Sequence, residues 1–217
     1  MVCISESNTH IIACATVAEE LIHLGIPKNQ ITELEFGLHN LPQKLRTTLQ
    51  AKIDKVNGVE NILLGYGLCS NSVIGLSSKT CRLVIPKVDD CISLFLGSNE
   101  ERLQRLFKDP GTFYLTKGWI KAGKEELTIL EERYGGKKAI EIRNMMFKNY
   151  THVTLINTGN YKMDEYRALA GQEAESAELK FREVPGSNRL IKKMINGEWD
   201  SEFMVAEPGE EIFFQTY

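Results

Sequence analysis

Short apolar runs alternate with longer amphipathic segments along the first half of the chain. Compact apolar runs predict β-strands, and apolar residues at every third or fourth position predict helices. The predicted strands are residues 10–14, 31–36, 61–66 and 82–88, and the predicted helices are residues 17–24 and 41–56. The second of these helices is expected to end at Asn57-Gly58, a dipeptide typical of turns.

The second half repeats this pattern less regularly. The predicted strands are residues 112–115, 152–156, 180–184 and 203–206, and the predicted helices are residues 98–107, 124–134, 138–148, 163–178 and 188–195. Strands that alternate with helices are typical of a mostly parallel sheet covered by helices. We therefore predict a Rossmann-like α/β fold in two lobes, residues 1–115 and 116–217, with a crevice between them. One continuous sheet is the alternative.

The composition and net charge of the chain argue against some classes of protein. Lysine and arginine total 26 and aspartate and glutamate total 29, so the net charge of −3 argues against a nucleic-acid binder. The chain has neither a basic, apolar leader nor an apolar run of about 18 residues, so we expect a cytoplasmic protein. Its five cysteines are widely spaced and include no C-x-x-C pair. In a reducing compartment they are better interpreted as thiols or ligands than as disulfides.

Three of these cysteines lie at or just after the end of a predicted strand: Cys14, Cys69 and Cys91. Because the carboxyl ends of parallel strands meet at one edge of a sheet, we expect the three thiols to lie at that edge. Thiolates suit zinc and iron–sulfur clusters, and the long spacings indicate a functional centre rather than a local zinc knuckle. The alternative is that cysteine packs as a small apolar residue, which is our interpretation of Cys3 and Cys81.

Two further side chains belong to the same predicted edge. His39 follows the second strand and is the candidate for a fourth metal ligand; the alternative is a histidine that hydrogen-bonds its own turn. Asp90 precedes Cys91 and is the candidate acid–base catalyst. Its alternative is a turn aspartate that bonds its own backbone.

Three other residues are candidates for binding a cofactor or substrate. Gly67, in Gly65-Tyr66-Gly67, would let a ligand approach the main chain, although the third glycine of a dinucleotide fingerprint is missing. Asn71 belongs to a segment that we expect to cap a following helix, whose N–H groups favour a thiolate or a bound anion. Trp119 follows a strand of the second half, where it would line the pocket or pack in the core.

Several long strings in the chain are distinctive. They are His-Ile-Ile-Ala-Cys, Gly-Leu-His-Asn-Leu-Pro-Gln-Lys-Leu, Leu-Leu-Gly-Tyr-Gly-Leu-Cys-Ser-Asn, Ile-Pro-Lys-Val-Asp-Asp-Cys-Ile-Ser-Leu-Phe-Leu-Gly-Ser, Pro-Gly-Thr-Phe-Tyr-Leu-Thr-Lys-Gly-Trp and the tail from Val-Pro-Gly-Ser-Asn-Arg-Leu-Ile to Gly-Glu-Trp-Asp-Ser-Glu-Phe. Together these strings resemble domain-of-unknown-function family 1638. The resemblance runs from about residue 9 to about residue 210. It implies an anaerobic microbial setting, often beside corrinoid-dependent methyltransferase systems for methylated amines.

The resemblance also implies a ligand set. The family pattern has cysteines that match Cys14, Cys69 and Cys91 and a histidine that matches His39. This chain departs from the pattern in two places: Asp89 and Asp90 precede Cys91 where His-Asp or similar is expected, and an alanine follows Cys14 where glycine is usual. Neither departure removes a candidate ligand.

These features lead to one expected function and two alternatives. We expect a metal-binding protein with a three-cysteine site, with or without the histidine, that acts in thiol or methyl-group transfer. Zinc is the first expected metal, and a [4Fe–4S] cluster is the second. The first alternative is an accessory protein that delivers a metal or cofactor to a methyltransferase or a corrinoid protein. The second is a small-molecule-binding module without metal.

Overall fold

The chain divides into two compact units, each built around its own sheet. The computed structural model describes residues 8–69 and 71–213, without the side chains of residues 125 and 126. The first unit comprises Met1–Asn99 and Ser187–Tyr217, and the second comprises Glu100–Gly186. This division differs from the expected boundary between residues 115 and 116. The strand over residues 112–115 pairs within the sheet of the second unit, and the last strand of the chain returns to the sheet of the first unit. Both pairings join segments that are distant in the sequence, so the hydrophobic pattern does not reveal them.

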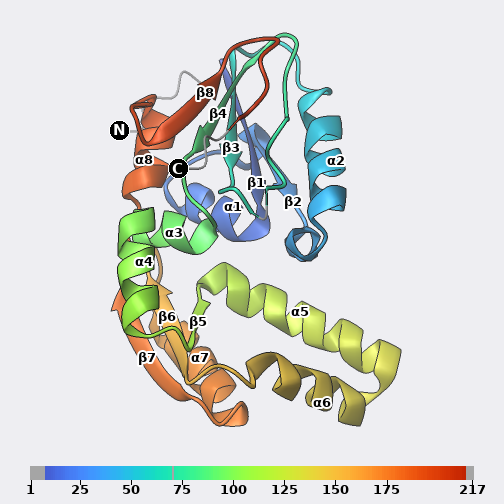
Figure 1. Cartoon of the computed structure of the whole chain (residues 1–217), viewed down its shortest axis with the longest axis vertical. Coiled ribbons are helices and arrows are strands. Elements are labelled where there is room, and N and C mark those ends of the chain that lie inside the picture. The colour runs from blue at the N-terminus through green and yellow to red at the C-terminus, as the bar shows by residue number, and fades with distance from the viewer. Residues whose placement is uncertain (1–7, 70, 214–217) are drawn as a thin grey trace. The chain divides into compact units, whose positions relative to one another are not determined.

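A five-stranded sheet forms the centre of the first unit, in the order β2-β1-β3-β4-β8 (Figure 1). Its strands are β1 (Thr9–Cys14), β2 (Ile31–Leu34), β3 (Asn61–Gly65), β4 (Arg82–Pro86) and β8 (Phe203–Ala206). The first four are parallel to their neighbours, and β8 runs antiparallel to β4. The predicted α/β class with a mostly parallel, Rossmann-like sheet is therefore confirmed.

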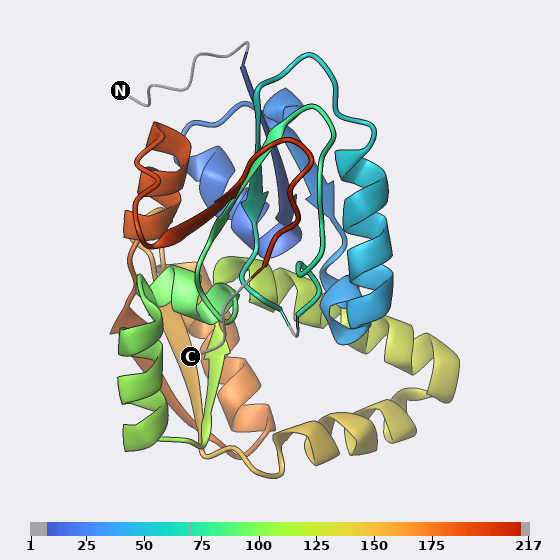
Figure 2. The ribbon, with the colours of Figure 1, turned by 45° about the horizontal axis from the view of Figure 1, so that its top comes forward.

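Helices cover both faces of this sheet. They are α1 (Ala15–His23), α2 (Pro42–Ile53), α3 (Cys91–Leu96) and α8 (Arg189–Asn196), with short 3-10 helices η1 (Lys28–Gln30) and η2 (Phe36–Asn40). Leu45 of α2 packs in one cluster with Ile12, whereas Val17 of α1 lies on the side of Ala13 and Gly65. Because neighbouring residues of a strand point to opposite faces, α1 and α2 lie on opposite sides of the sheet (Figure 2).

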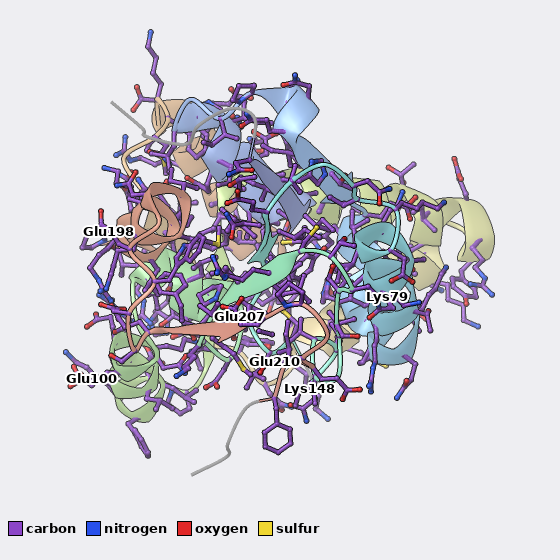
Figure 3. The ribbon with its side chains drawn as sticks, turned by 90° about the horizontal axis from the view of Figure 1, so that it is seen from above. Lys79, Glu100, Lys148, Glu198, Glu207 and Glu210 are labelled. Atoms are coloured by element: carbon purple, nitrogen blue, oxygen red, sulfur yellow. The ribbon has the colours of Figure 1, made fainter. Side chains whose placement is uncertain are left out.

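The loop between β3 and β4 is held by the segment that follows β8. Gly75 donates its backbone N–H to the carbonyl of Ile212, and Ile212 donates to the carbonyl of Leu76, each at 2.8 Å. Glu207 and Glu210 lie along this segment (Figure 3), and the backbone N–H of Glu207 donates to Oε2 of Glu210 at 3.0 Å. The loop that carries Cys69 is therefore anchored at its far end.

The second unit has a three-stranded parallel sheet in the order β5-β6-β7. Its strands are β5 (Thr112–Leu115), β6 (His152–Asn157) and β7 (Lys180–Pro185), and its helices are α4 (Asn99–Lys108), α5 (Lys117–Tyr134), α6 (Gly136–Phe147) and α7 (Asp164–Ser176). Val153 and Leu155 of β6 are fully buried in one cluster with Ala170 of α7. Across residues 8–69 and 71–213, no helix is both long and apolar enough to cross a lipid bilayer.

Candidate metal centre

The strand order of the first sheet reverses between β1 and β3. The chain passes from β1 to β2 on one side and then returns to place β3 and β4 on the other side. In open α/β sheets, the crevice outside the strand ends at such a reversal is the usual ligand site. Cys14 ends β1 and Cys69 follows β3, so the structure places these two predicted ligands on the two sides of the reversal.

Cys14 is the N-cap residue of helix α1. Its sulfur lies 3.0 Å from the hydroxyl oxygen of Thr16, and the backbone N–H groups of Thr16 and Val17 stabilise a negative charge on it. Burial opposes that stabilisation and raises the pKa of the Cys14 thiol above its ordinary value. Without a cation, Cys14 therefore keeps its proton at neutral pH.

Cys69 has an unusual backbone conformation for a residue with a side chain. Its φ of 44° lies in the left-handed region, where strain in a residue other than glycine is of the order of 1 kcal/mol. The pKa of its thiol is raised to about 12, mainly by burial and also by the negative charges of Cys14 and Asp90, while a backbone hydrogen bond from Gly67 lowers it. The two thiols are close enough that ionisation of one opposes ionisation of the other.

Gly67 has a different role from the one that the sequence suggested. A Cβ atom at this position would lie 2.6 Å from the carbonyl oxygen of Val88 and 2.8 Å from the backbone nitrogen of Asp90. The absence of a side chain therefore lets two stretches of main chain meet, where we expected a ligand. Hydrogen bonds from Leu68 to Val88 (2.8 Å) and from Cys69 to Asp89 (3.0 Å) join the same two turns.

Cys91 and Asp90 lie at the start of helix α3, which the sequence pattern did not predict. Asp90 is the N-cap: its Oδ1 accepts hydrogen bonds from the backbone N–H of Ser93 at 2.8 Å and from the Ser93 hydroxyl at 3.1 Å. Cys91 is the first residue of the helix and is partly buried. The capping role agrees with the alternative that we gave for Asp90, and its role in acid–base chemistry stays a prediction.

His39 lies in the 3-10 helix η2, after β2. Its Nδ1 donates a hydrogen bond to the carbonyl oxygen of Phe36, and its ring meets the Phe36 ring edge-on at 4.4 Å between centroids. This is the turn-bonded histidine of the alternative interpretation. The same bond leaves the lone pair of the neutral imidazole on Nε2, which is the arrangement of many metal-binding histidines.

The two remaining candidates for ligand binding lie in different surroundings. Asn71 is exposed, with a φ of 63°, and turns rather than a helix occupy residues 71–75, so the expected helix cap after Cys69 is wrong. Trp119 belongs to the second unit, where it packs against the core and meets Phe113 edge-on at 6.1 Å. Cys3 lies outside the described residues.

The thiol pair is not part of a complete ligand set in this conformation. Within residues 8–69 and 71–213, no group of three or more His, Cys, Asp and Glu side chains is arranged to hold a metal ion. The structure therefore brings Cys14 and Cys69 together and does not gather Cys91 and His39 around them. The soft sulfur donors suit a thiolate-bound metal, and its full coordination stays a prediction.

The sequence pattern missed one polar group at this edge, the hydroxyl of Tyr66. Tyr66 is only 2% exposed, and its Oη has no hydrogen-bond partner within the described part of the chain. After burial, the charges of Cys14 and Cys69 are the next causes that raise its pKa well above the ordinary value. Both cysteines pack against the apolar cluster that contains Tyr66. A tyrosine next to an apolar strand gave no signal that distinguished it from core.

Comparison with known proteins identifies a family and nothing more specific. A search of curated proteins and a search of solved structures each found no match. The family model described as "Protein of unknown function (DUF1638)" matches residues 33–195, a span that includes His39, Cys69 and Cys91 and begins after Cys14. Because this match covers more than half of the chain, as the resemblance of its strings led us to expect, the chain belongs to the DUF1638 family.

Proposed function

We propose that the protein binds a metal ion through cysteine thiolates at the carboxyl edge of its first sheet and acts in thiol or methyl-group transfer. The observation that carries this proposal is the position of Cys14 and Cys69 on the two sides of the strand-order reversal. Soft sulfur donors favour zinc as the first metal and a [4Fe–4S] cluster as the second. The partner would be a corrinoid protein or a methyltransferase, as the family resemblance implies.

The electrostatics of the pair support a cation in this place. Burial raises the pKa of both thiols, and the charge of Cys14 raises that of Cys69 as well, so both stay protonated when no positive charge is present. A metal ion would remove the repulsion between Cys14 and Cys69 and release their protons, so binding should strengthen as the pH rises. The N–H groups at the start of α1 would then hydrogen-bond the Cys14 sulfur, as they are already placed to do.

Cys91 is the proposed third thiolate, at the first position of α3. With three thiolates the fourth position would take the substrate sulfur; the alternative is a closed site in which His39 fills that position through Nε2. The metal would supply one chemical function, which is to hold a substrate thiol as its nucleophilic thiolate at neutral pH. The chain would supply partial burial of this sulfur, since Cys14 and Cys69 are only partly exposed, and the amides that hold the Cys14 sulfur.

The test is the metal content and visible spectrum of protein purified without oxygen. We expect about one zinc per chain, or broad visible absorption from a cluster, and loss of the metal in Cys14→Ala and Cys69→Ala. Cys91→Ala should weaken binding. Cys81→Ala is the matched control, because Cys81 is 1% exposed in the core and donates its S–H to the carbonyl of Val59.

Two results would contradict the proposal. One is wild-type protein that carries neither metal nor cluster and binds neither when supplied. The other is retention of the metal, at wild-type affinity, by folded Cys14→Ala and Cys69→Ala proteins. A circular dichroism spectrum of each variant separates a lost ligand from a lost fold.

A further inference from the structure

Tyr66 is a buried tyrosine whose hydroxyl has no hydrogen bond to any residue that the structure describes. The residue follows β3, is 2% exposed, and its Oη atom has no partner in the described ranges. Almost all buried polar groups in native proteins are hydrogen-bonded, because an unsatisfied one is costly. A hydroxyl in this state therefore needs an explanation, and a ligand that is absent from the structure is a physical explanation of it.

The position of Tyr66 connects it to the thiol pair. Ala13 of β1 pairs with Gly65 of β3, so Cys14 and Tyr66 are the next neighbours across the two strands. Tyr66 belongs to the apolar cluster on the α2 face of the sheet, and both Cys14 and Cys69 pack against that cluster. Because the Oη atom has no partner, neither sulfur is within hydrogen-bonding reach of it.

The hydroxyl of Tyr66 can act as a hydrogen-bond donor, because a tyrosine carries its proton at neutral pH. Cys14 and Cys69 both pack against the apolar cluster that contains Tyr66. An electron-rich acceptor atom held next to the two sulfurs would therefore complete the hydrogen bonding of the Oη atom.

We infer that Tyr66 is a positioning residue that donates a hydrogen bond from Oη to the sulfur of a substrate thiolate held at the Cys14–Cys69 site. This inference rests on the proposed function, since the metal there would hold the substrate as its thiolate. The ligand class is a small thiol, and the role of Tyr66 is to orient its sulfur. The cost of leaving the hydroxyl unpaired is borne by the unliganded protein.

The experiment compares wild type with Tyr66→Phe, which removes the hydroxyl and keeps the ring. Both proteins are loaded with Co²⁺ and titrated with 2-mercaptoethanol, whose binding changes the sulfur-to-cobalt absorption. A hydrogen bond to a charged acceptor predicts at least about tenfold weaker thiol affinity in the variant and no change in Co²⁺ affinity. The metal-free variant should unfold at a higher urea concentration than wild type, because an unsatisfied buried group is gone.

Tyr114→Phe is the control, since Tyr114 is a buried tyrosine of the second unit, and it should change neither quantity. Unchanged thiol affinity in Tyr66→Phe, with cobalt and thiol bound normally by wild type, overturns the inference and leaves the proposed function standing. Failure of wild type to bind Co²⁺ overturns both. If Tyr66→Phe does not fold, Tyr66→Leu takes its place in the thiol titration, and wild-type thiol affinity in that variant also overturns the inference.

Discussion

Cys14 and Cys69 lie on opposite sides of the point where the strand order of the first sheet reverses. They are far apart in sequence, and the pairing of β1 with β3 brings them to one edge. The charge of Cys14 raises the pKa of Cys69, and the charges of both cysteines raise the pKa of Tyr66. The ionisation of the two thiols is therefore coupled. Such a pair forms only when the sheet has folded. This dependence is more typical of a functional site than of a structural metal site built from neighbouring residues.

The high pKa of Cys69 predicts a dependence of stability on alkaline pH. Burial raises this pKa from 9.0 to about 12, so the folded state holds the proton more tightly than the unfolded state. The stabilising contribution is complete below pH 9 and is lost as the pH rises towards 12. Wild type should therefore lose stability relative to Cys69→Ala over this range.

Urea denaturation of the metal-free proteins at a series of pH values measures this difference. The comparison between two proteins cancels the lysine and tyrosine groups that titrate in the same range. A stability difference between wild type and Cys69→Ala that stays constant from pH 8 to pH 11 would show that the thiol is not shielded from water as the structure indicates.

The close main-chain contacts of Gly67 predict that adding one methyl group there destabilises the carboxyl edge of the first sheet. In Gly67→Ala the new Cβ would meet the main chain of Val88 and Asp90 at less than 3 Å, so the two turns must separate. Overpacking of this kind costs about 1–3 kcal/mol of unfolding free energy, and it should also weaken metal binding. Gly37→Ala is the matched control, because a Cβ at Gly37 has no neighbour within 4 Å among the described residues.

Urea denaturation and competition with a zinc chelator test this pair of variants. The Gly37→Ala protein should stay within about 0.5 kcal/mol of wild type. Equal stability of the two variants would mean that the turns after β3 and β4 move apart without cost.

Much of the fold was predictable because local patterns carry it. The strand over 112–115 has the predicted bounds, and the strands that begin at residues 61 and 82 start where expected. Helix α3 was missed because all of Ile92–Leu96 is buried, so the run has no polar face and no helical period. The direction of β8 was also out of reach, since its pairing with β4 joins distant segments.

The candidate site was predictable only as a set of positions. The rule that strand ends share an edge placed Cys14 and Cys69 correctly beside each other. The same rule said nothing about side-chain direction, so it could not separate this pair from Cys91 and His39. The left-handed backbone of Cys69 depends on tertiary packing, as does the hydroxyl of Tyr66, which has no partner in residues 8–69 and 71–213. Neither feature has a signature in the sequence.

Glu202 predicts a loss of stability in acid. Arg189 and Lys193 of α8 bind its carboxylate, with Lys193 Nζ at 2.7 Å, and the hydrogen bond from Arg189 is the largest cause that lowers its pKa to about 2. A lowered pKa contributes stability that is present above pH 4.5 and is lost as the pH falls towards 2. Glu202→Gln should therefore be less stable than wild type at pH 7, by about 1 kcal/mol because the cluster is partly exposed.

Thermal unfolding at pH 7 and at pH 3 measures the difference, which should shrink at the lower pH. Glu198→Gln is the control: Glu198 is exposed and accepts a hydrogen bond from Asn196, and its replacement should change stability by less than about 0.5 kcal/mol. A Glu202→Gln effect of equal size at both pH values would mean that packing, rather than charge, accounts for it.

Asp90 offers a test that separates its two actions on the site. Its carboxylate caps α3 through Ser93, and its charge is one of the causes that raise the pKa of Cys69. Asp90→Asn keeps a capping oxygen and removes the charge, so stability should stay within about 0.5 kcal/mol of wild type. The pKa of Cys69 should fall, and iodoacetamide should modify Cys69 faster at a fixed pH, as followed by peptide mass spectrometry.

Asp90→Ala should show the same faster modification and lose about 1 kcal/mol of unfolding free energy through the missing cap. Unchanged modification of Cys69 in both variants would restrict Asp90 to the cap and remove it from the chemistry of the thiol pair.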